Sequence, residues 1–355
     1  LFGPSAVEEI LEFFRPEPST MLLVRRNENK EPDSYRLADG AVDLVRIRND
    51  FADGYTIVLN GVERYVHAIA SLSHAIEVEL NFQTHVNAYV TPPGSQGFHP
   101  HYDDYDVLIL QIQGSKTWHL YDAAVVPPRE MPRRATIDTA TLALPTDIRL
   151  EAGDVLYLPR GQVHAAEAGA EPSIHLTVGI HAPTVLTVIT RALAALSFRD
   201  DRVLARLPPR HLGDACVRAS LGVLMRDIVK AVEDPSVIAE GLDSMEDALI
   251  RRGRCRPVGQ MVSNAVEAAR IDGQTLVRKY QPLYSRVMPI AGGVVLQFAQ
   301  SLVSGGPDHE AAMLFLSRST EPFRVRDLPG LGPAQQRELA RTLIVDGFLV
   351  RVPDD

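Results

Sequence analysis

The chain of 355 residues is 45% hydrophobic, which is enough apolar material for a sizeable core divided between two or three domains. Its formal net charge of −9 and its lack of a basic block exclude a general nucleic-acid-binding protein, although an acidic protein can attract a basic peptide. The two cysteines, Cys216 and Cys255, have no zinc-ligand spacing, which excludes a thiolate metal site and a disulfide scaffold.

The same features predict where the protein works. No apolar stretch is long enough to span a bilayer, so we expect no membrane partner. The sparse cysteines fit a reducing compartment, and we expect a cytoplasmic protein. The chain begins with Leu1 rather than Met, which leaves open whether a leader segment precedes it.

The first half of the chain has the pattern of an all-β barrel or jelly roll. After one or two helices, of which one is predicted over residues 6–14, short β-like runs separated by Pro, Gly and Asp extend from about residue 36 to residue 182. These runs cover residues 55–60, 85–91, 106–113, 117–121, 154–160 and 173–180. We therefore expect a mainly β domain over residues 1–183.

Helical periodicity follows the β pattern. Apolar residues recur at intervals of three and four over 185–198, 215–232 and 236–252, which predicts an α-helical domain over residues 184–270. These segments carry more apolar positions than helices on the side of a barrel need. Because exposed apolar surface usually marks an interface, we expect this domain to form a homodimer.

The last part of the chain, residues 271–355, has the element order of a small winged-helix domain. A hairpin is predicted over 284–300, followed by short helices and a last strand over 348–352. Five arginines and four acidic residues between 320 and 352 leave a net charge too small to neutralise many phosphates. We therefore favour a docking or structural role and expect no direct DNA binding.

Side chains that bind metals stand in the β region. His101 and Asp103 are two residues apart, so in a strand they share a face and project together into the barrel. In GDVLYLPRGQVH, residues 153–164, a strand is followed by a turn that places His164 at the far end. Two imidazoles and one carboxylate form the facial triad of Fe(II) oxygenases, which leaves positions for a bidentate cosubstrate and O2. We predict that His101, Asp103 and His164 bind iron and are catalytic.

Three further histidines lie close in sequence to these ligands. Pro100 removes a ladder donor, so we expect His99 at the rim of the barrel rather than in a regular strand. His119 and His175 are interpreted as core residues or as residues that support the ligands.

Lys116 follows the turn at 113–115 and begins the strand that returns antiparallel to 107–112. It shares a face with Trp118 and Leu120, which suggests that it points inward. A buried ammonium needs compensation, and no acid in its own strand can neutralise it, so a bound carboxylate is a natural partner. The strand pattern is equally compatible with a lysine that reaches solvent.

These motifs resemble a known family. The His101-Tyr-Asp103 sequence, Lys116, Trp118 and residues 153–164 resemble the Jumonji-C (JmjC) branch of Fe(II)/2-oxoglutarate oxygenases. Residues 101–121 are especially similar to the ribosomal oxygenases, which hydroxylate ribosomal proteins. The resemblance is strongest over 85–181. It implies a double-stranded β-helix, as in cupins, followed by a helical dimerisation domain and a C-terminal winged-helix domain.

The resemblance also implies roles for residues of the cosubstrate site. Lys116 would pair with the distal carboxylate of 2-oxoglutarate. Asn87 and Tyr89 share a strand face and match positions that line the same pocket, and Thr177 is placed with them as a cosubstrate-binding residue. Gly179 departs from the family, which commonly has serine there, because glycine has no side chain to donate a hydrogen bond.

The implied function is hydroxylation of a protein side chain, with Fe(II) as cofactor and 2-oxoglutarate and O2 as cosubstrates. A basic ribosomal protein, modified on histidine or arginine, suits the acidic balance of the chain. Two alternatives stay open: a hydroxylase of a peptide natural-product precursor or small metabolite, and a non-catalytic metal-binding cupin that serves as a docking protein. Release of succinate that depends on 2-oxoglutarate, in the presence of a candidate peptide, distinguishes the enzymes from the binder.

Overall fold

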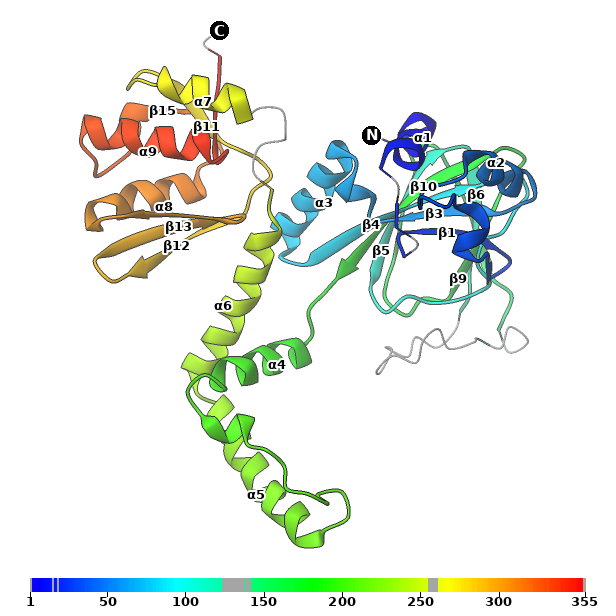
Figure 1. Ribbon diagram of the computed structural model, residues 1–355, viewed down its shortest axis with the longest axis horizontal. Coiled ribbons are helices and arrows are strands. Elements are labelled where there is room, and N and C mark those ends of the chain that lie inside the picture. Colours follow the sequence, from blue (N-terminus) through cyan, green and yellow to red (C-terminus); the bar gives the residue numbers. More distant parts are fainter. Residues whose placement is uncertain are drawn as a thin grey trace. The chain divides into compact units, whose positions relative to one another are not determined.

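The computed structural model describes residues 2–14, 16, 17, 19–122, 137, 142–254 and 261–353. The chain divides into two compact units (Figure 1). The first consists of Leu1–Glu77 and Phe82–Ala182, and the second of Val78–Asn81 and Pro183–Asp355. The predicted division into residues 1–183, 184–270 and 271–355 stays a prediction.

Two antiparallel sheets form the first unit. The larger sheet has the strand order β2-β1-β3-β4-β10-β5-β8, and the smaller has the order β7-β6-β9. The strands of the larger sheet are β1 (Met21–Arg25), β2 (Glu28–Asn29), β3 (Thr56–Asn60), β4 (Gln83–Thr91), β5 (Asp106–Gln113), β8 (Val155–Leu158) and β10 (Ser173–His181). Those of the smaller are β6 (Ser115–Leu120), β7 (Thr146–Glu151) and β9 (His164–Ala168).

The connections between the sheets give a double-stranded β-helix. His101 forms a β-bridge with His164 at the start of β9, so the chain before β5 adds to the edge of the smaller sheet. The chain thus crosses repeatedly between the two sheets. Apolar side chains between them include Ile109 of β5, Trp118 of β6 and Leu158 of β8. The predicted cupin-like β-rich fold is confirmed.

The path of β6 differs from the sequence expectation. We expected Lys116 on a strand that returns antiparallel to 107–112, whereas β6 pairs with β7 and β9 in the smaller sheet. The turn at Gly114, with φ of +64°, leads the chain from one sheet to the other. Lys116 therefore reaches across the barrel interior to Thr91 of β4 and His175 of β10 instead of lying beside β5.

Helices also interrupt the region in which we expected only strands from about residue 36. The helix α1 (Pro4–Phe13) was predicted, but α2 (Leu44–Ala52) and α3 (His67–Leu80) were not. The Asp43 carboxylate accepts hydrogen bonds from two backbone amides of the first turn and so caps α2. Side chains of α1 and α2, among them Ile10 and Ile47, pack with Ile57 on the larger sheet.

The longer segment of the second unit, Pro183–Asp355, begins with the three predicted helices: α4 (Val185–Leu196), α5 (Ala215–Val232) and α6 (Pro235–Arg252). Two three-stranded sheets follow, with the orders β12-β13-β14 and β15-β11-β16. Their elements are α7 (Met261–Ala269), β11 (Leu276–Lys279), β12 (Ser285–Ile290), β13 (Gly293–Phe298), β14 (Ser301–Gly305), α8 (Glu310–Arg318), β15 (Phe323–Arg324), α9 (Pro333–Val345) and β16 (Leu349–Arg351).

Polar contacts join α6 to the hairpin β12–β13. Arg286 of β12 pairs with Glu246 of α6 at 2.9 Å, and Gln297 of β13 donates to Asp247 at 2.6 Å. The predicted hairpin is therefore present and packs against α6. Of the helices in the described part of the chain, none is long and apolar enough to cross a membrane.

Candidate active site

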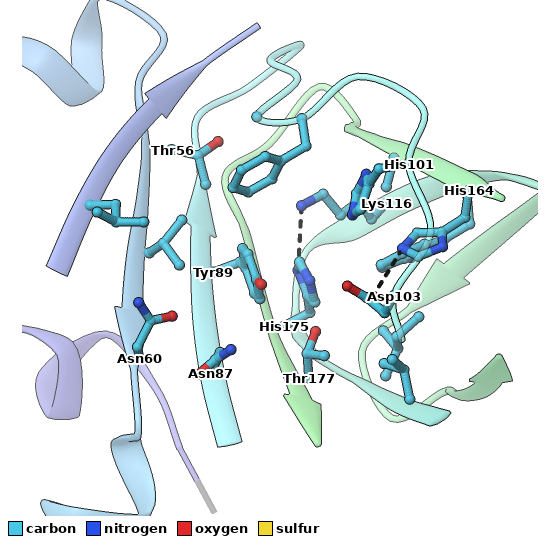
Figure 2. Close-up of a pocket in the computed structure, with 18 of the residues that line it drawn as sticks. Thr56, Asn60, Asn87, Tyr89, His101, Asp103, Lys116, His164, His175 and Thr177 are labelled. Atoms are coloured by element: carbon cyan, nitrogen blue, oxygen red, sulfur yellow. Dashed lines mark hydrogen bonds and ion pairs between the residues drawn. The ribbon is translucent and has the colours of Figure 1, made fainter. Parts of the chain in front are cut away.

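A cavity of about 260 Å³ lies inside the first unit, between the two sheets. Its lining includes all seven residues predicted from the sequence to form the site, which come from β4, β6, β9, β10 and the segment before β5 (Figure 2). These residues are Asn87, Tyr89, His101, Asp103, Lys116, His164 and Thr177.

His101, Asp103 and His164 come together on one side of the cavity. Each offers a ligand atom that lies within 4.8 Å of the others, and His164 Nε2 is 3.8 Å from Asp103 Oδ2. The backbone fixes this arrangement. His101 and His164 exchange two backbone hydrogen bonds, and the Asp103 carbonyl accepts from Gly161 N at 2.9 Å. His164 thus begins β9, after the turn that follows β8.

Hydrogen bonds orient both imidazoles. His101 Nδ1 lies 2.8 Å from the His99 carbonyl and His164 Nδ1 lies 2.9 Å from the Gln162 carbonyl, so each Nδ1 is placed to donate its proton. In these tautomers Nε2 carries the lone pair of each ring. Burial lowers the pKa of His164, which favours the neutral form that binds metals.

This donor set fits a divalent metal ion. Atoms that share one ion at bond lengths of about 2 Å lie roughly 3–4 Å apart, which matches the His164–Asp103 separation. Two neutral imidazoles and one carboxylate are the ligands typical of non-haem Fe(II) sites. Backbone carbonyls that hold the far nitrogen of each ring are a usual feature of such sites.

Lys116 points into the cavity, as one of the two sequence interpretations expected. Its side chain is buried, and Nζ donates to Thr91 Oγ1 at 3.0 Å and lies 3.3 Å from His175 Nδ1. Among the described residues, no carboxylate forms an ion pair with Nζ. Burial lowers the pKa of Lys116 to about 7, because nothing nearby compensates the lost hydration of the ammonium.

Another buried donor in the cavity wall is the Trp118 indole N–H. Trp118 is 5% exposed, and its Nε1 has no hydrogen-bond partner within the described part of the protein. A buried indole N–H normally finds an acceptor. The Trp118 N–H and the Lys116 ammonium together make this part of the cavity suited to an anionic ligand that accepts hydrogen bonds.

The remaining predicted residues form the floor of the cavity on β4 and β10. Tyr89 stacks on His175 with ring centroids 4.7 Å apart. Asn87 and Thr177 are register partners, and the Asn87 side chain accepts from Gly61 N at 3.1 Å. Asn87 is therefore positioned by a hydrogen bond to the backbone, while Thr177 extends the polar floor beside it.

The other three histidines near the ligands lie in different environments. His99 is exposed and absent from the cavity lining, as expected for a rim residue. His175 is buried in the wall, and burial, with the nearby Lys116, holds its pKa well below the usual value. The interpretation of His119 was wrong: it lies on the face of β6 opposite to Trp118 and contacts Asp147 at 2.6 Å.

Sequence reasoning missed several lining residues. Thr56 and Val58 come from β3, and Phe98 and Tyr105 come from the irregular chain between β4 and β5. The alternation of β3 could have indicated that Thr56, Val58 and Asn60 share a face. Nothing local in the sequence shows which face of the sheet holds the cavity. The alternation along β3 alone could therefore not identify these residues as part of the site.

Residues 64–188, which include every predicted ligand, match the JmjC domain family. This segment is a JmjC domain. The resemblance inferred from the sequence is thereby confirmed. The JmjC domain provides both sheet faces of the cavity, while β1 and β3 precede it and contribute Leu22, Thr56, Val58 and Asn60.

Curated relatives match part of the chain. The chain is 37% identical over 147 residues to ribosomal oxygenase 2 of Rattus norvegicus, which covers 40% of this chain and 31% of that protein. It is 26% identical over 254 residues to the bifunctional lysine-specific demethylase and histidyl-hydroxylase NO66 of Aedes aegypti, which covers 67% of this chain and 39% of that protein. The chain therefore spans well under half the length of these two relatives.

The fold of the chain as a whole is similar to that of a solved protein. The X-ray structure of E. coli YcfD matches with a TM-score of 0.57 and 17% identity, over 99% of this chain and 91% of that chain. YcfD is described as a ribosomal oxygenase, and its structure in complex with cobalt and 2-oxoglutarate matches with a TM-score of 0.53 at 17% identity over the same shares. At this identity the likeness concerns the fold.

Proposed function

We propose that the protein is an Fe(II)- and 2-oxoglutarate-dependent oxygenase that hydroxylates a side chain of a protein substrate. One observation carries this proposal: the JmjC cavity has a two-histidine, one-carboxylate ligand set near a buried lysine that forms no ion pair with a carboxylate of the described residues. A cupin that only binds metal does not need a buried lysine beside the metal ligands. The relative described as a ribosomal oxygenase and the fold neighbour bound to cobalt and 2-oxoglutarate support the same assignment.

Each part of the cavity has a role in this proposal. His101, Asp103 and His164 would hold Fe(II), which with 2-oxoglutarate and O2 supplies the oxidation of a substrate C–H bond, with release of succinate and CO2. Lys116 would pair with the distal carboxylate of the cosubstrate, and Thr91 would orient the ammonium through its hydroxyl.

The apolar wall has a separate task. Val107, Ile109 and Trp118 are buried and line the cavity between the sheets. They exclude water from the reacting atoms and so strengthen the charge pairing at Lys116. Tyr89, stacked on His175, and the adjacent pair Asn87 and Thr177 would limit the position of the cosubstrate on the opposite side.

A basic segment of a ribosomal protein is the substrate that we propose first. The chain carries a net charge of −9, and Asp104, next to the ligand Asp103, is exposed. Opposite charge accelerates encounter with a basic partner. The name histidyl-hydroxylase of one relative supports a histidine side chain as the site of hydroxylation, and arginine is the other side chain that we propose.

The test is to incubate the pure protein with Fe(II), ascorbate and ribosomes from the host, with and without 2-oxoglutarate. We expect mass spectrometry to find an added oxygen on a ribosomal protein only when 2-oxoglutarate is present. Turnover of 2-oxoglutarate without any ribosomal product would favour a peptide natural-product precursor or small metabolite as substrate. Metal binding without turnover would favour the docking protein.

Replacement of a proposed ligand tests the site itself. We expect Asp103→Ala to abolish 2-oxoglutarate turnover and to weaken iron binding, while the melting temperature of the metal-free protein stays near that of the wild type. The half-exposed carboxylate contributes to metal binding and not to core packing. Asp147→Ala, on the outer face of the smaller sheet, is the matched control and should keep both properties. Full turnover by Asp103→Ala with bound iron would show that the ligand set is wrong.

A further inference from the structure

A cluster of three rings lies where the cavity floor continues beyond Asn87 and Thr177. Side chains alternate along a strand, so His85, Asn87 and Tyr89 share one face of β4, and Thr177, Gly179 and His181 share the same face of β10. Because Asn87, Tyr89 and Thr177 line the cavity, His85 and His181 continue its floor past the lining residues.

Gly179 makes room for the His85 imidazole. The two residues are register partners in the β4–β10 ladder. A Cβ added to Gly179 would lie within 2.7 Å of His85 Nδ1 and 2.8 Å of Nε2, which is closer than unbonded atoms approach. The imidazole thus lies directly over the glycine backbone, and any other residue at 179 would displace it.

Two neighbours hold the imidazole in place. His85 Nδ1 and His181 Nε2 share a hydrogen bond of 2.8 Å. The Tyr105 ring meets His85 edge to face, with centroids 5.0 Å apart, and lies 4.7 Å from His181. Tyr105 itself lines the cavity and is two residues from the ligand Asp103, so the cluster borders the metal side of the site.

The cluster is remote from the lysine end. Lys116 contacts Thr91, at the opposite end of β4 from His85. Thr91 and His85 are six positions apart along the strand, a distance of about 20 Å. A small dicarboxylate that pairs with Lys116 and reaches the metal ligands would leave the His85 end of the floor uncovered. His85 is half-buried and His181 is exposed, so this end opens toward solvent.

We propose that His85 is a specificity-determining residue. Its imidazole lies over Gly179, contacts His181 and Tyr105, and extends the cavity floor as a surface, called the His85 wall below, that positions the incoming substrate side chain. This inference rests on the proposed hydroxylase function. The His85 wall is flat and aromatic, so it suits a planar side chain such as an imidazole or a guanidinium, which can stack on it. Removal of the ring enlarges the entrance and should relax the choice of side chain.

The test compares variants on a fixed pool of substrates. The probe is a set of synthetic peptides that share basic flanking residues and differ only in a central His, Arg, Leu or Trp. For wild type we expect 2-oxoglutarate-dependent oxygen addition to His or Arg peptides. For His85→Ala we expect the ratio of kcat/KM between planar and aliphatic peptides to fall tenfold or more, since small changes in a pocket wall shift selectivity by about 10–200-fold. The KM for 2-oxoglutarate should not change.

Further variants separate the His85 wall from a structural effect. Gly179→Ala should displace the ring and reproduce the selectivity change, and His85→Phe should retain the preference for planar side chains because the ring is kept. His119→Ala, a histidine on the outer face of the smaller sheet, should behave as wild type. The melting temperature of each variant shows whether the substitution has destabilised the fold.

The outcomes distinguish this inference from the proposed function. Absence of 2-oxoglutarate-dependent oxygen addition by wild type to any peptide and to ribosomes would overturn both. Wild-type activity with unchanged selectivity in His85→Ala and Gly179→Ala would overturn the role of His85 alone. A selectivity change in His85→Ala that also raised the KM for 2-oxoglutarate by the same factor would assign His85 to the cosubstrate site instead.

Discussion

Lys116 is the residue whose environment separates an anion-binding oxygenase from a simple metal site. Its ammonium is buried among neutral partners, Thr91 and His175, in a cavity that also holds the Trp118 indole N–H. A buried cation without a counter-charge is unfavourable unless a ligand supplies the charge. A carboxylate bound beside Lys116 would therefore offset the free-energy cost of burying the ammonium.

Removal of Lys116 should therefore weaken cosubstrate binding strongly. Lys116→Ala leaves the distal carboxylate desolvated and unpaired, a cost of about 3–5 kcal/mol, or roughly two to four decades in affinity. Lys116→Arg should recover part of the loss because a guanidinium also pairs with carboxylates. Titration of 2-oxoglutarate into the three iron-loaded proteins measures this. Iron affinity is the control and should be equal, and equal 2-oxoglutarate affinity in wild type and Lys116→Ala would refute the role.

The depressed pKa of Lys116 makes cosubstrate binding depend on pH. Burial lowers this pKa to about 7, so above pH 7 the lysine is mostly neutral in the ligand-free protein, while a bound carboxylate favours the charged form and raises the pKa. Affinity for 2-oxoglutarate should therefore be full below pH 7 and fall by up to about tenfold per pH unit above it.

Calorimetry in buffers of different ionisation enthalpy measures the proton uptake behind this dependence. At pH 8 we expect wild type to take up nearly one proton per bound 2-oxoglutarate, and little at pH 6. Lys116→Arg should take up none, because the guanidinium stays charged throughout. The same uptake in both proteins at pH 8 would place the titrating group elsewhere.

Residue identities and spacings were sufficient to predict most of the site. His101 and Asp103, two residues apart, Lys116, and His164 at the end of residues 153–164 all reach one cavity. The cluster at His85 was not predicted, because its meaning depends on the register between β4 and β10. Register is a long-range property, and only that pairing sets His85 over Gly179.

At the scale of elements, the turn between β5 and β6 positions the site. It carries the chain from one sheet to the other and so sends Lys116 into the cavity. Gly114 has a φ of +64°, and a Cβ there would collide with the Pro172 carbonyl oxygen and lie 3.3 Å from Ser173 Cα. The sheet crossing thus requires both the left-handed conformation and the missing side chain of glycine.

Gly114→Ala should destabilise the protein more than the loss of a left-handed glycine alone, which costs about 1–2 kcal/mol. The collision with the 172–173 backbone adds to this cost, because backbone atoms cannot move as a flexible side chain does. Gly94→Ala is the matched control, since Gly94 has a φ of +58° and open space around its Cβ position. Denaturant unfolding of both variants should show a clearly larger loss for Gly114→Ala, and equal losses would contradict the steric argument.

Elements with strong local patterns were predicted well, and elements that depend on tertiary contacts were not. The strand β5 and the helix α5 have the bounds that were predicted, residues 106–113 and 215–232. The strand β9, with the sequence HAAEA, has low intrinsic strand preference and forms because β6 pairs with it. Local patterns also carry no information on sheet membership, which is why β6 was assigned to the wrong partner.

At the scale of the molecule, composition and periodicity indicated a β-rich part followed by a helical part, and the two compact units divide near the predicted residue 183. The sequence could not show how the later helices combine. Ala268 at the end of α7 packs with residues of β11 and α9 in one apolar core. The helix α7 therefore belongs to the core of the C-terminal sheets. Such packing follows from long-range contacts and not from the helix pattern itself.

The helices α4, α5 and α6 expose apolar side chains that water solvates poorly. Val185 and Leu186 on α4 are 76% and 66% exposed, Met225 and Val229 on α5 are 59% and 56% exposed, and Leu242 on α6 is 49% exposed. Scattered exposed apolar residues are ordinary, but a concentration on consecutive helices is typical of an interface. A symmetric homodimer is the commonest way to cover such a surface. The predicted homodimer therefore stays our expectation.

Sedimentation at micromolar concentration tests this expectation on the whole chain. We expect a dimer mass for wild type and a monomer for the double variant Met225→Glu and Val229→Glu, because residues four apart share a helix face and two buried carboxylates would disrupt the interface. Leu302→Glu, which places one carboxylate on β14 at a side chain that is 61% exposed, should remain a dimer. Helical circular dichroism should be equal in all three proteins. A monomeric wild type, or a dimer that persists in the double variant, would show that these helices do not form the interface.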